Sequence, residues 1–161
     1  MERIYLLLGS NVGNLKENVE RAVKLIEACG IEVLKKSKMY KTKPWGVRDQ
    51  PDFLNMALEV RSGLSAPELL RIFKEIEVEI GREKSTGRWL SRVIDIDILF
   101  MDGLVIRQPD LTIPHREFFN RGFAMRILSE IAPDFRPPGT VKSLSEILSG
   151  EPDEGIEVYR D

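Results

Sequence analysis

The sequence predicts an α+β protein of the ferredoxin-like kind, a mainly antiparallel sheet covered by helices. The first observation behind this prediction is the order of hydrophobic patterns, which runs strand, helix, strand, strand, helix, strand. The second is size, because 161 residues with 42% hydrophobic content suffice for one domain with a buried core. Many activities occur on this fold, so the fold class alone indicates none of them.

The first strand and helix are expected at the N-terminal end. An apolar run over residues 4–8, followed by Gly9, predicts a buried strand. Asn14 is a suitable N-cap for a helix that continues to about Ala28 and carries its apolar residues at helical spacing. Gly30 is well placed to end this helix.

The middle of the chain supplies two strands and a second helix. Residues 31–40 and 53–60 have strand patterns, and the proline-containing, charged segment 43–51 predicts a surface loop between them. Ser65 is expected to cap the second helix, which has a regular apolar face and is expected to end at Gly81.

The C-terminal part is expected to begin with a basic loop over residues 82–92. The clearest strand pattern of the chain follows at residues 93–101. A short helix is expected over residues 123–131 and a final helical turn over residues 143–148. Near the end, Ile156 and Val158 alternate with polar residues and permit an edge strand.

The composition argues against several classes of protein. A formal net charge of −2 and a pI near 5.6 argue against general nucleic-acid binding, which usually needs a basic surface. The N-terminus lacks a signal-peptide pattern and no run is long enough to span a membrane, so the cytoplasm is the expected location. The one cysteine, Cys29, excludes an internal disulfide and is expected to be a small buried residue.

The segment Val93-Ile94-Asp95-Ile96-Asp97-Ile98 carries the strongest chemical signal. Because side chains alternate along a strand, Asp95 and Asp97 project from one face while the isoleucines face the core. Two neighbouring carboxylates repel each other and are costly to bury, and a divalent cation removes that cost. Such oxygen ligands suit Mg²⁺, which takes one or two carboxylates together with substrate phosphates and water.

Four cations precede this strand, namely Arg82, Lys84, Arg88 and Arg92. A metal ion and guanidinium groups together neutralise the charge that develops in polyphosphate chemistry. Taken separately, the two features have structural alternatives, a solvent-facing acidic strand and an exposed, salt-bridged loop. Taken together, they favour a metal-dependent site for a polyphosphate.

A glycine-containing turn, Gly9-Ser10-Asn11-Val12-Gly13-Asn14, follows the first strand. It lacks the lysine and hydroxyl residue that end a Walker A loop. Its backbone amides are a candidate phosphate cradle, and a tight turn between strand and helix is the alternative interpretation.

Residues 88–97 read Arg-Trp-Leu-Ser-Arg-Val-Ile-Asp-Ile-Asp, and further blocks lie at residues 9–11, 40–46, 49–55, 77–82, 111–115 and 121–123. In this order and spacing, the blocks resemble those of the 6-hydroxymethyl-7,8-dihydropterin pyrophosphokinase family, whose members act in folate biosynthesis. The resemblance runs from about Ile4 to Pro133 and fades beyond that point.

The resemblance implies one pyrophosphokinase domain over residues 1–161, with residues 150–161 as a peripheral C-terminal extension. It implies a magnesium-dependent transferase in which the hydroxymethyl oxygen of the pterin attacks the β-phosphorus of ATP and AMP is released. Asp95 and Asp97 are then expected to hold two Mg²⁺ ions, one of which can polarise the attacking hydroxyl. The expected partners are ATP and the pterin alcohol, with no nucleic acid and no membrane, and contact with other folate-pathway enzymes is allowed.

The resemblance also assigns residues to each role. The catalytic set is Arg82, Arg92, Asp95 and Asp97. The ATP-binding set is Lys74, Glu77, Lys84, Arg88, Arg92, Ile98, Thr112, His115, Arg116 and Arg121. The pterin-binding set is Thr42, Pro44, Trp45, Gly46, Phe53, Asn55, Asp95 and Phe123. In the pterin set the two phenylalanines match aromatics that stack on the flat ring, and the asparagine can donate and accept at its edge.

The residue types alone leave other interpretations open. Core packing is the ordinary role of a phenylalanine, and a lone histidine such as His115 is more often structural than catalytic. A metal-dependent nucleotidyl or phosphoryl transferase with another acceptor would differ only on the pterin side. A ferredoxin-like RNA-binding module would expose aromatic residues and a basic surface, whereas this chain displays Asp95 and Asp97.

The chain departs from the family pattern at three places. Leu90-Ser91 replaces a usual Gly-Pro, Val93-Ile94 replaces a usual Thr-Leu, and Arg116 replaces a usual proline or tyrosine. The first change bears on a loop that is expected to move during catalysis, and the second removes a hydroxyl. The third alters a nucleotide contact, although an arginine there could meet a phosphate.

Overall fold

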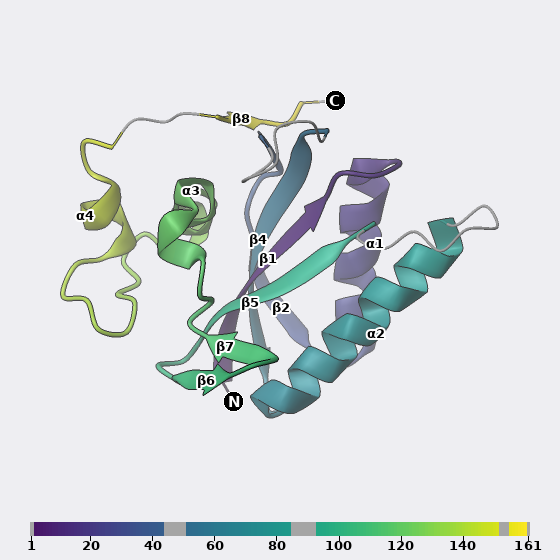
Figure 1. The fold of residues 1–161 in the computed structure, drawn as a ribbon, viewed down its shortest axis with the longest axis horizontal. Helices are drawn as coiled ribbons and strands as arrows, with labels where there is room; N and C mark the ends of the chain where they lie inside the picture. The colour runs from purple at the N-terminus through teal and green to yellow at the C-terminus, as the bar shows by residue number, and fades with distance from the viewer. Residues whose placement is uncertain (1, 44–50, 85–92, 152–154, 161) are drawn as a thin grey trace.

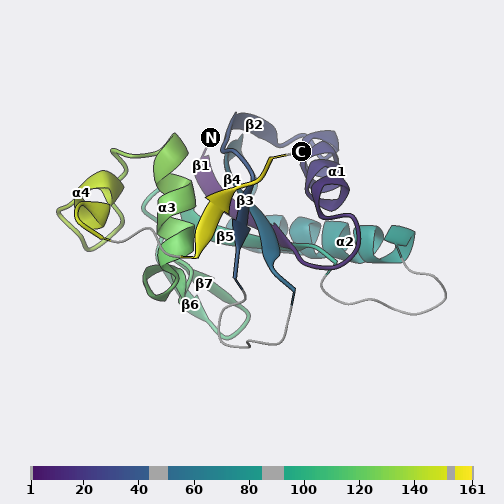
Figure 2. The same ribbon diagram turned by 90° about the horizontal axis from the view of Figure 1, so that it is seen from above.

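The structure is a computed structural model that describes residues 2–43, 51–84, 93–151 and 155–160, without the side chain of Lys84. Its helices are α1 (Leu15–Ala28), α2 (Ala66–Lys84), α3 (Gly122–Ile131) and the short α4 (Leu144–Leu148). As Figures 1 and 2 show, α1 and α2 cover one face of a β-sheet, α3 covers the other face, and α4 lies outside α3.

The main sheet consists of β1 (Glu2–Ser10), β2 (Glu32–Lys36), β3 (Tyr40–Thr42), β4 (Phe53–Ser62), β5 (Asp95–Met101) and β8 (Ile156–Val158). The strands follow the order β5-β1-β4-β3-β8, β2 also pairs with β4, and the pairings among these described strands are antiparallel. With helices on both faces, this arrangement confirms the predicted ferredoxin-like α+β class. A separate hairpin, β6 (Ile106–Gln108) and β7 (Leu111–Ile113), follows β5 and leads to a 3₁₀ turn over Phe118–Asn120.

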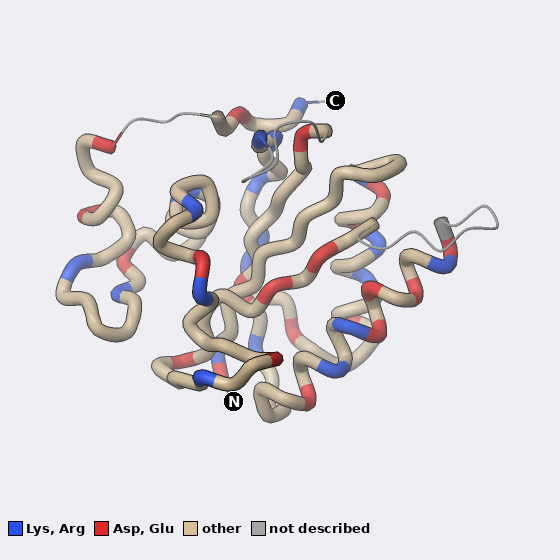
Figure 3. Tube along the Cα trace, viewed as in Figure 1, with Lys and Arg blue, Asp and Glu red and all other residues tan. Residues whose placement is uncertain are grey.

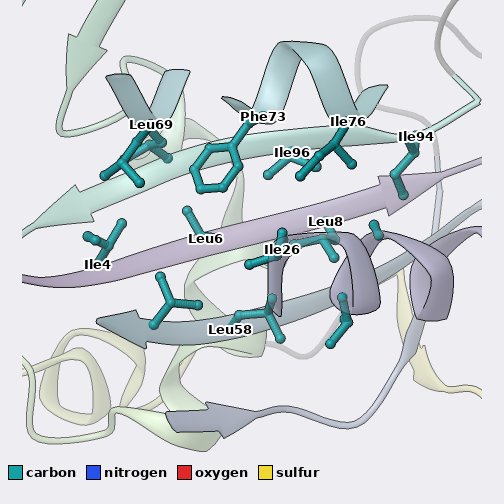
Figure 4. Close-up of a cluster of buried hydrophobic side chains, with 14 of the residues drawn as sticks. Ile4, Leu6, Leu8, Ile26, Leu58, Leu69, Phe73, Ile76, Ile94 and Ile96 are labelled. Atoms are coloured by element: carbon teal, nitrogen blue, oxygen red, sulfur yellow. The ribbon is translucent and has the colours of Figure 1, made fainter. Parts of the chain in front are cut away.

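The larger part of the core lies between the sheet and the helices α1 and α2. Figure 4 shows Leu6 and Leu8 of β1 below Phe73 of α2, with Ile96 of β5 beside Phe73 and Ile26 of α1 next to Leu8. All five side chains are buried, and each contributes roughly 1.5–3 kcal/mol when it leaves water. Because side chains alternate along a strand, burial of these residues places their neighbours in sequence on the face that points away from α1 and α2.

A second core cluster lies on the other face of the sheet, under α3. Tyr5 and Leu7 of β1 pack there with Phe100 of β5, Phe118 of the 3₁₀ turn and Ile127 of α3. The rings of Phe100 and Phe118 meet edge to face with their centroids 4.7 Å apart, a favourable aromatic geometry. This cluster anchors the 3₁₀ turn and α3 to the sheet.

The single strand predicted over residues 31–40 is instead two strands, β2 and β3. The ladder is interrupted at Ser37, whose hydroxyl oxygen accepts the Ala57 N–H at 2.9 Å in place of a backbone carbonyl. In the other direction the Ser37 N–H donates to the Ala57 carbonyl at 2.9 Å. Both strands still pair with β4, so the predicted strand is divided in two but the order of strands in the sheet is unchanged.

The first strand does not stop at Gly9, because β1 continues to Ser10, paired with β4 on one side. The second helix does not stop at Gly81 but continues to Lys84, so Arg82 lies in a helix and not in the predicted loop. Glu83 in this added turn accepts from Arg21 of α1 at 2.8 Å, and this pair fastens the end of α2 to α1.

Other boundaries also differ in detail. The strand predicted from residue 93 begins at Asp95. Cys29 is exposed and is the C-cap residue of α1, so the prediction of a buried cysteine was wrong. By contrast, Asn14 does cap α1, since its side-chain oxygen accepts the Glu17 N–H at 3.2 Å.

A β-bulge in β5 sets the geometry around the acidic pair. Leu6 pairs with Ile98 whereas Tyr5 pairs with Phe100, so Leu99 is an extra residue in β5. The Leu99 carbonyl accepts the His115 N–H at 3.0 Å. The bulge therefore attaches His115, which follows the hairpin, to the strand that carries the aspartates.

A buried hydrogen-bond chain joins the end of β1 to the start of the β5 segment. The Ser10 hydroxyl donates to the Val93 carbonyl at 2.6 Å and accepts from the Asn18 amide of α1 at 3.0 Å. The same amide also donates to the Val12 carbonyl at 2.8 Å. Because Ser10 and Asn18 are fully buried, this chain links three elements with no competition from water.

We expect Ser10→Ala to lower the free energy of unfolding by about 1–3 kcal/mol, because the Val93 carbonyl and the Asn18 amide each lose a partner. Urea unfolding measures the loss, with Ser149→Ala as the control, since Ser149 is exposed. Equal stability of the two variants would contradict a structural role for this chain.

Candidate functional site

Asp95 and Asp97 lie on the face of β5 that points away from α1 and α2, while Ile94, Ile96 and Ile98 are buried on the opposite face. In Figure 3, red marks acidic positions along the strand that Figure 1 labels β5. Both aspartates are half-buried, and the side chain of Asp97 is 33% exposed. The strand thus holds two adjacent carboxylates at a surface that a ligand can reach.

Two basic or polar groups from distant parts of the chain approach Asp97. The carboxylate oxygen Oδ2 lies 3.9 Å from Nη1 of Arg121, the residue before α3, and 3.9 Å from Nε2 of His115. Both partners are about one-quarter exposed or less. Since neither distance is a close hydrogen bond, an intervening ligand atom could bridge these groups.

His115 is held as a neutral imidazole. Burial lowers its pKa, an effect that the Asp97 charge opposes and the Arg121 charge reinforces. Its Nδ1 accepts the Glu117 N–H at 3.1 Å, so the ring proton is on Nε2, the atom nearest Asp97. The geometry therefore presents a neutral donor beside the acidic pair.

Glu77 of α2 supports β5 from the edge of the sheet. Its Oε2 accepts the N–H of Ile96, the residue between the two aspartates, at 2.8 Å. Burial raises the pKa of Glu77, and the hydrogen bond from Ile96 and the charge of Lys74, 3.4 Å away, oppose the rise. The Glu77 carboxylate thus provides an acceptor for the Ile96 N–H, which lies on the open edge of β5 between the two aspartates.

A cavity of about 270 Å³ opens beside Asp97, between α2, β5 and the β6–β7 hairpin. Its lining includes five residues of the predicted ATP-binding set, namely Lys74, Ile98, Thr112, His115 and Arg116. Arg116 is exposed and donates to the Thr112 hydroxyl at 3.4 Å. These residues come from three separate parts of the chain, and their roles stay predictions.

Sequence reasoning did not select Leu70, Pro109, Asp110, Leu111 and Glu117, which also line this cavity. Their only local signal is that they neighbour predicted residues along the chain or along a helix. Glu117, for example, follows His115 by two positions and donates its N–H to the imidazole.

Two of the predicted pterin residues, Asn55 and Thr42, lie on the paired strands β4 and β3, which β1 separates from Asp95 of β5. The Asn55 side-chain amide of β4 donates to the Thr42 hydroxyl of β3 at 2.5 Å. Gly9 of β1 pairs with Asn55 on one side and with Asp95 on the other. Phe123 belongs to α3, which covers the same face, and is partly buried against the second core cluster.

Some predicted residues are not brought to the acidic pair. Arg82 is exposed on α2 and lines a shallow hollow together with Lys74, two helical turns away. Phe53 borders a different and larger hollow of about 590 Å³, with Lys41 and Glu157 at the edge near β8. Pro44, Trp45, Gly46, Arg88 and Arg92, the side chain of Lys84 and the departure Leu90-Ser91 lie outside the described residues.

Asp95 and Asp97 offer carboxylate oxygens as possible metal ligands. Within the described part of the chain, no group of three or more His, Cys, Asp or Glu side chains could hold a metal ion. Two adjacent carboxylates without a third ligand fit Mg²⁺ better than Zn²⁺, because Mg²⁺ keeps water and substrate phosphates in its shell. The donor set therefore suits a cation that arrives with a polyphosphate.

A family model and a relative of similar length both match the chain, and both carry the name of a pterin pyrophosphokinase. Residues 5–133 match the family described as 7,8-dihydro-6-hydroxymethylpterin-pyrophosphokinase. The chain is 39% identical over 158 residues to the 2-amino-4-hydroxy-6-hydroxymethyldihydropteridine pyrophosphokinase of Methylorubrum extorquens, and the match covers 98% of each protein.

Other relatives are much longer. The chain is 37% identical over 156 residues to the folic acid synthesis protein fol1 of Schizosaccharomyces pombe, a match that covers 96% of this chain but only 21% of that protein. A crystal structure of Plasmodium falciparum HPPK-DHPS superposes with a TM-score of 0.77 at 15% identity and covers 98% of this chain and 48% of that one. No described helix is both long and apolar enough to cross a bilayer.

We expect Glu77→Ala to reduce the free energy of unfolding by about 1–3 kcal/mol, because the Ile96 N–H loses a buried charged acceptor. Glu77→Gln keeps an acceptor oxygen at the same place and should lose less than half as much. Paired urea titrations of the two variants check this. Equal losses would mean that the carboxylate acts through its charge and not through this hydrogen bond.

Proposed function

The chain belongs to the 7,8-dihydro-6-hydroxymethylpterin-pyrophosphokinase family, and we propose that it transfers the terminal pyrophosphoryl group of ATP to the hydroxymethyl oxygen of 6-hydroxymethyl-7,8-dihydropterin, releasing AMP, in folate biosynthesis. The observation that carries the proposal is the position of β5. Its two aspartates stand between the cavity lined by the ATP-side residues and the strands that carry Gly9 and Asn55.

Asp95 and Asp97 would hold Mg²⁺, which when bound neutralises phosphate oxygens and polarises the attacking hydroxyl. Arg121 and Lys74 would contribute positive charge on either side of the polyphosphate. His115, neutral and with its proton on Nε2, would donate to a phosphate oxygen without adding charge. Arg116 at the cavity rim is a further candidate phosphate contact.

The remaining cations would act on the group that moves. Arg82 and Arg92, with Lys84 and Arg88 in support, would stabilise charge that builds up during transfer. Arg82 is exposed on α2 in this structure, and so its contact with the phosphates would require the nucleotide to extend along that helix or the side chain to move.

The pterin ring would lie on the other side of Asp95. Asn55 and Thr42 would read its edge, and Phe53 and Phe123 would contact its faces. Support comes from the shared sheet face of Asn55 and Asp95 and from α3, which brings Phe123 to that face. The segment with Pro44, Trp45 and Gly46 would complete the pocket.

The cytoplasm and a single domain over residues 1–161 remain predictions from the sequence. Contact with other folate-pathway enzymes also remains a proposal. Two relatives make this contact worth testing, because the match covers only 21% of the Schizosaccharomyces pombe protein and 27% of the Arabidopsis thaliana protein, and both extend far beyond it.

We expect Asp95→Ala and Asp97→Ala each to lower turnover by about a hundredfold or more, because each loses a ligand for the metal that neutralises the phosphates. The assay supplies ATP, Mg²⁺ and 6-hydroxymethyl-7,8-dihydropterin and identifies the nucleotide product as AMP. Asp134→Ala, at an exposed position, is the matched control. ADP as the product would indicate an ordinary kinase, and near wild-type rates in either site variant would refute the metal assignment.

We expect Asn55→Ala to weaken pterin binding by about 1–3 kcal/mol, the usual cost of an unpaired buried polar partner. Phe123→Ala should also weaken it, through lost stacking and buried area. Calorimetric titration with the pterin and with an ATP analogue separates the two sides of the site. Phe119→Ala is the control, because Phe119 is an exposed ring on the neighbouring 3₁₀ turn. Unchanged pterin affinity in both site variants would remove the pocket assignment.

A further inference from the structure

Gly9 occupies a regular position within β1, where glycine is not required by the backbone. It pairs with Asn55 of β4 and Asp95 of β5, and its φ angle is not among the positive ones of this chain. Glycine in a strand interior costs stability relative to residues with a side chain, and it commonly marks a place where something approaches the backbone closely. Gly9 therefore indicates that another group comes close to the backbone on the face shared with Asn55 and Asp95.

The space above Gly9 is tightly defined. A Cβ atom at this position would lie 2.7 Å from Oδ1 of Asn55, closer than real Cβ contacts, and 3.6 Å from Cδ1 of Phe53, an ordinary contact. The nitrogen of the same Asn55 amide is held by the Thr42 hydroxyl at 2.5 Å, which turns the oxygen toward Gly9. Among the described residues, none donates to this oxygen.

The strip of bare backbone at Gly9 is flanked by two acceptors. The Asn55 oxygen lies on one side, and the Asp95 carboxylate projects from the next strand on the other. Strands in a sheet are about 4.8 Å apart, so Asn55 and Asp95 stand about 10 Å apart with Gly9 between them. A flat ligand with N–H donors on its edge fits this arrangement, whereas a bulky or purely acceptor edge does not.

We propose that Gly9 is a specificity-determining residue, whose missing side chain allows a planar, donor-bearing heterocycle to lie against the sheet between Asn55 and Asp95. The proposal rests on the proposed function, in which the pterin is this heterocycle. It gives the Gly9-Ser10 segment two separate roles on opposite faces of β1, because Gly9 opens the ring site while Ser10 joins the Val93 carbonyl.

The first test is Gly9→Ala, assayed as kcat/KM for the pterin with AMP as the detected product. The added methyl should lower this value by about tenfold or more, the effect of overfilling a well-packed space by one methyl group. In Gly9→Ala protein that folds, binding of an ATP analogue should stay near wild type. Gly63→Ala is the matched control, because Gly63 has no positive φ and an added Cβ there meets nothing within 4 Å.

The decisive comparison repeats the change in an Asn55→Ala background. There the oxygen that a Cβ would strike is gone, so the methyl fits the protein and only the ligand can meet it. A further fall in pterin kcat/KM from Asn55→Ala to the double variant supports the proposal, even if Gly9→Ala alone fails to fold. Equal values would overturn it and reduce Gly9 to a spacer for Asn55. By contrast, a wild-type enzyme that forms no AMP with this pterin would overturn the proposed function itself.

Discussion

The site depends on the alternation of side chains over residues 94–98, ahead of the bulge in β5. Ile94, Ile96 and Ile98 are buried under α2, and this burial obliges Asp95 and Asp97 to point the other way. A slip of one residue would bury both carboxylates and expose the isoleucines, at a cost far larger than any single contact in the site. Burial of the isoleucines thus keeps the two carboxylates side by side although their charges repel each other.

Other elements of the site are arranged around this strand by contacts that also stabilise the fold. The bulge at Leu99 gives His115 a backbone anchor, and Glu77 satisfies the edge N–H between the aspartates. Both groups are therefore positioned before any ligand arrives. Preorganised dipoles of this kind lower the reorganisation needed when charge develops in a reaction.

Local patterns sufficed to predict the fold class, the Asn14 cap of α1 and the two faces of β5, because periodicity and capping are properties of neighbouring residues. The interruption at Ser37 and the bulge at Leu99 could not be predicted, since each arises from pairing with a strand or loop distant in sequence. Beyond Gly81, α2 likewise has a partner distant in sequence, Arg21 of another helix. For the site, the sequence singled out the acidic pair and the resemblance assigned His115 and Arg121 to ATP, but their approach to Asp97 depends on the tertiary structure.

The edges of the main sheet carry features that hinder pairing with the strands of another chain. Open strand edges invite pairing with other chains and are a common route to aggregation. Here β8 at one side is three residues long, β2 has a bulge after Val33 followed by the exposed Lys35 and Lys36, and the Ile96 N–H on β5 is already taken by Glu77. Glu77 thus occupies a donor on the edge of the sheet as well as supporting the site, and a change made there to alter nucleotide binding would also leave this edge N–H open to another acceptor.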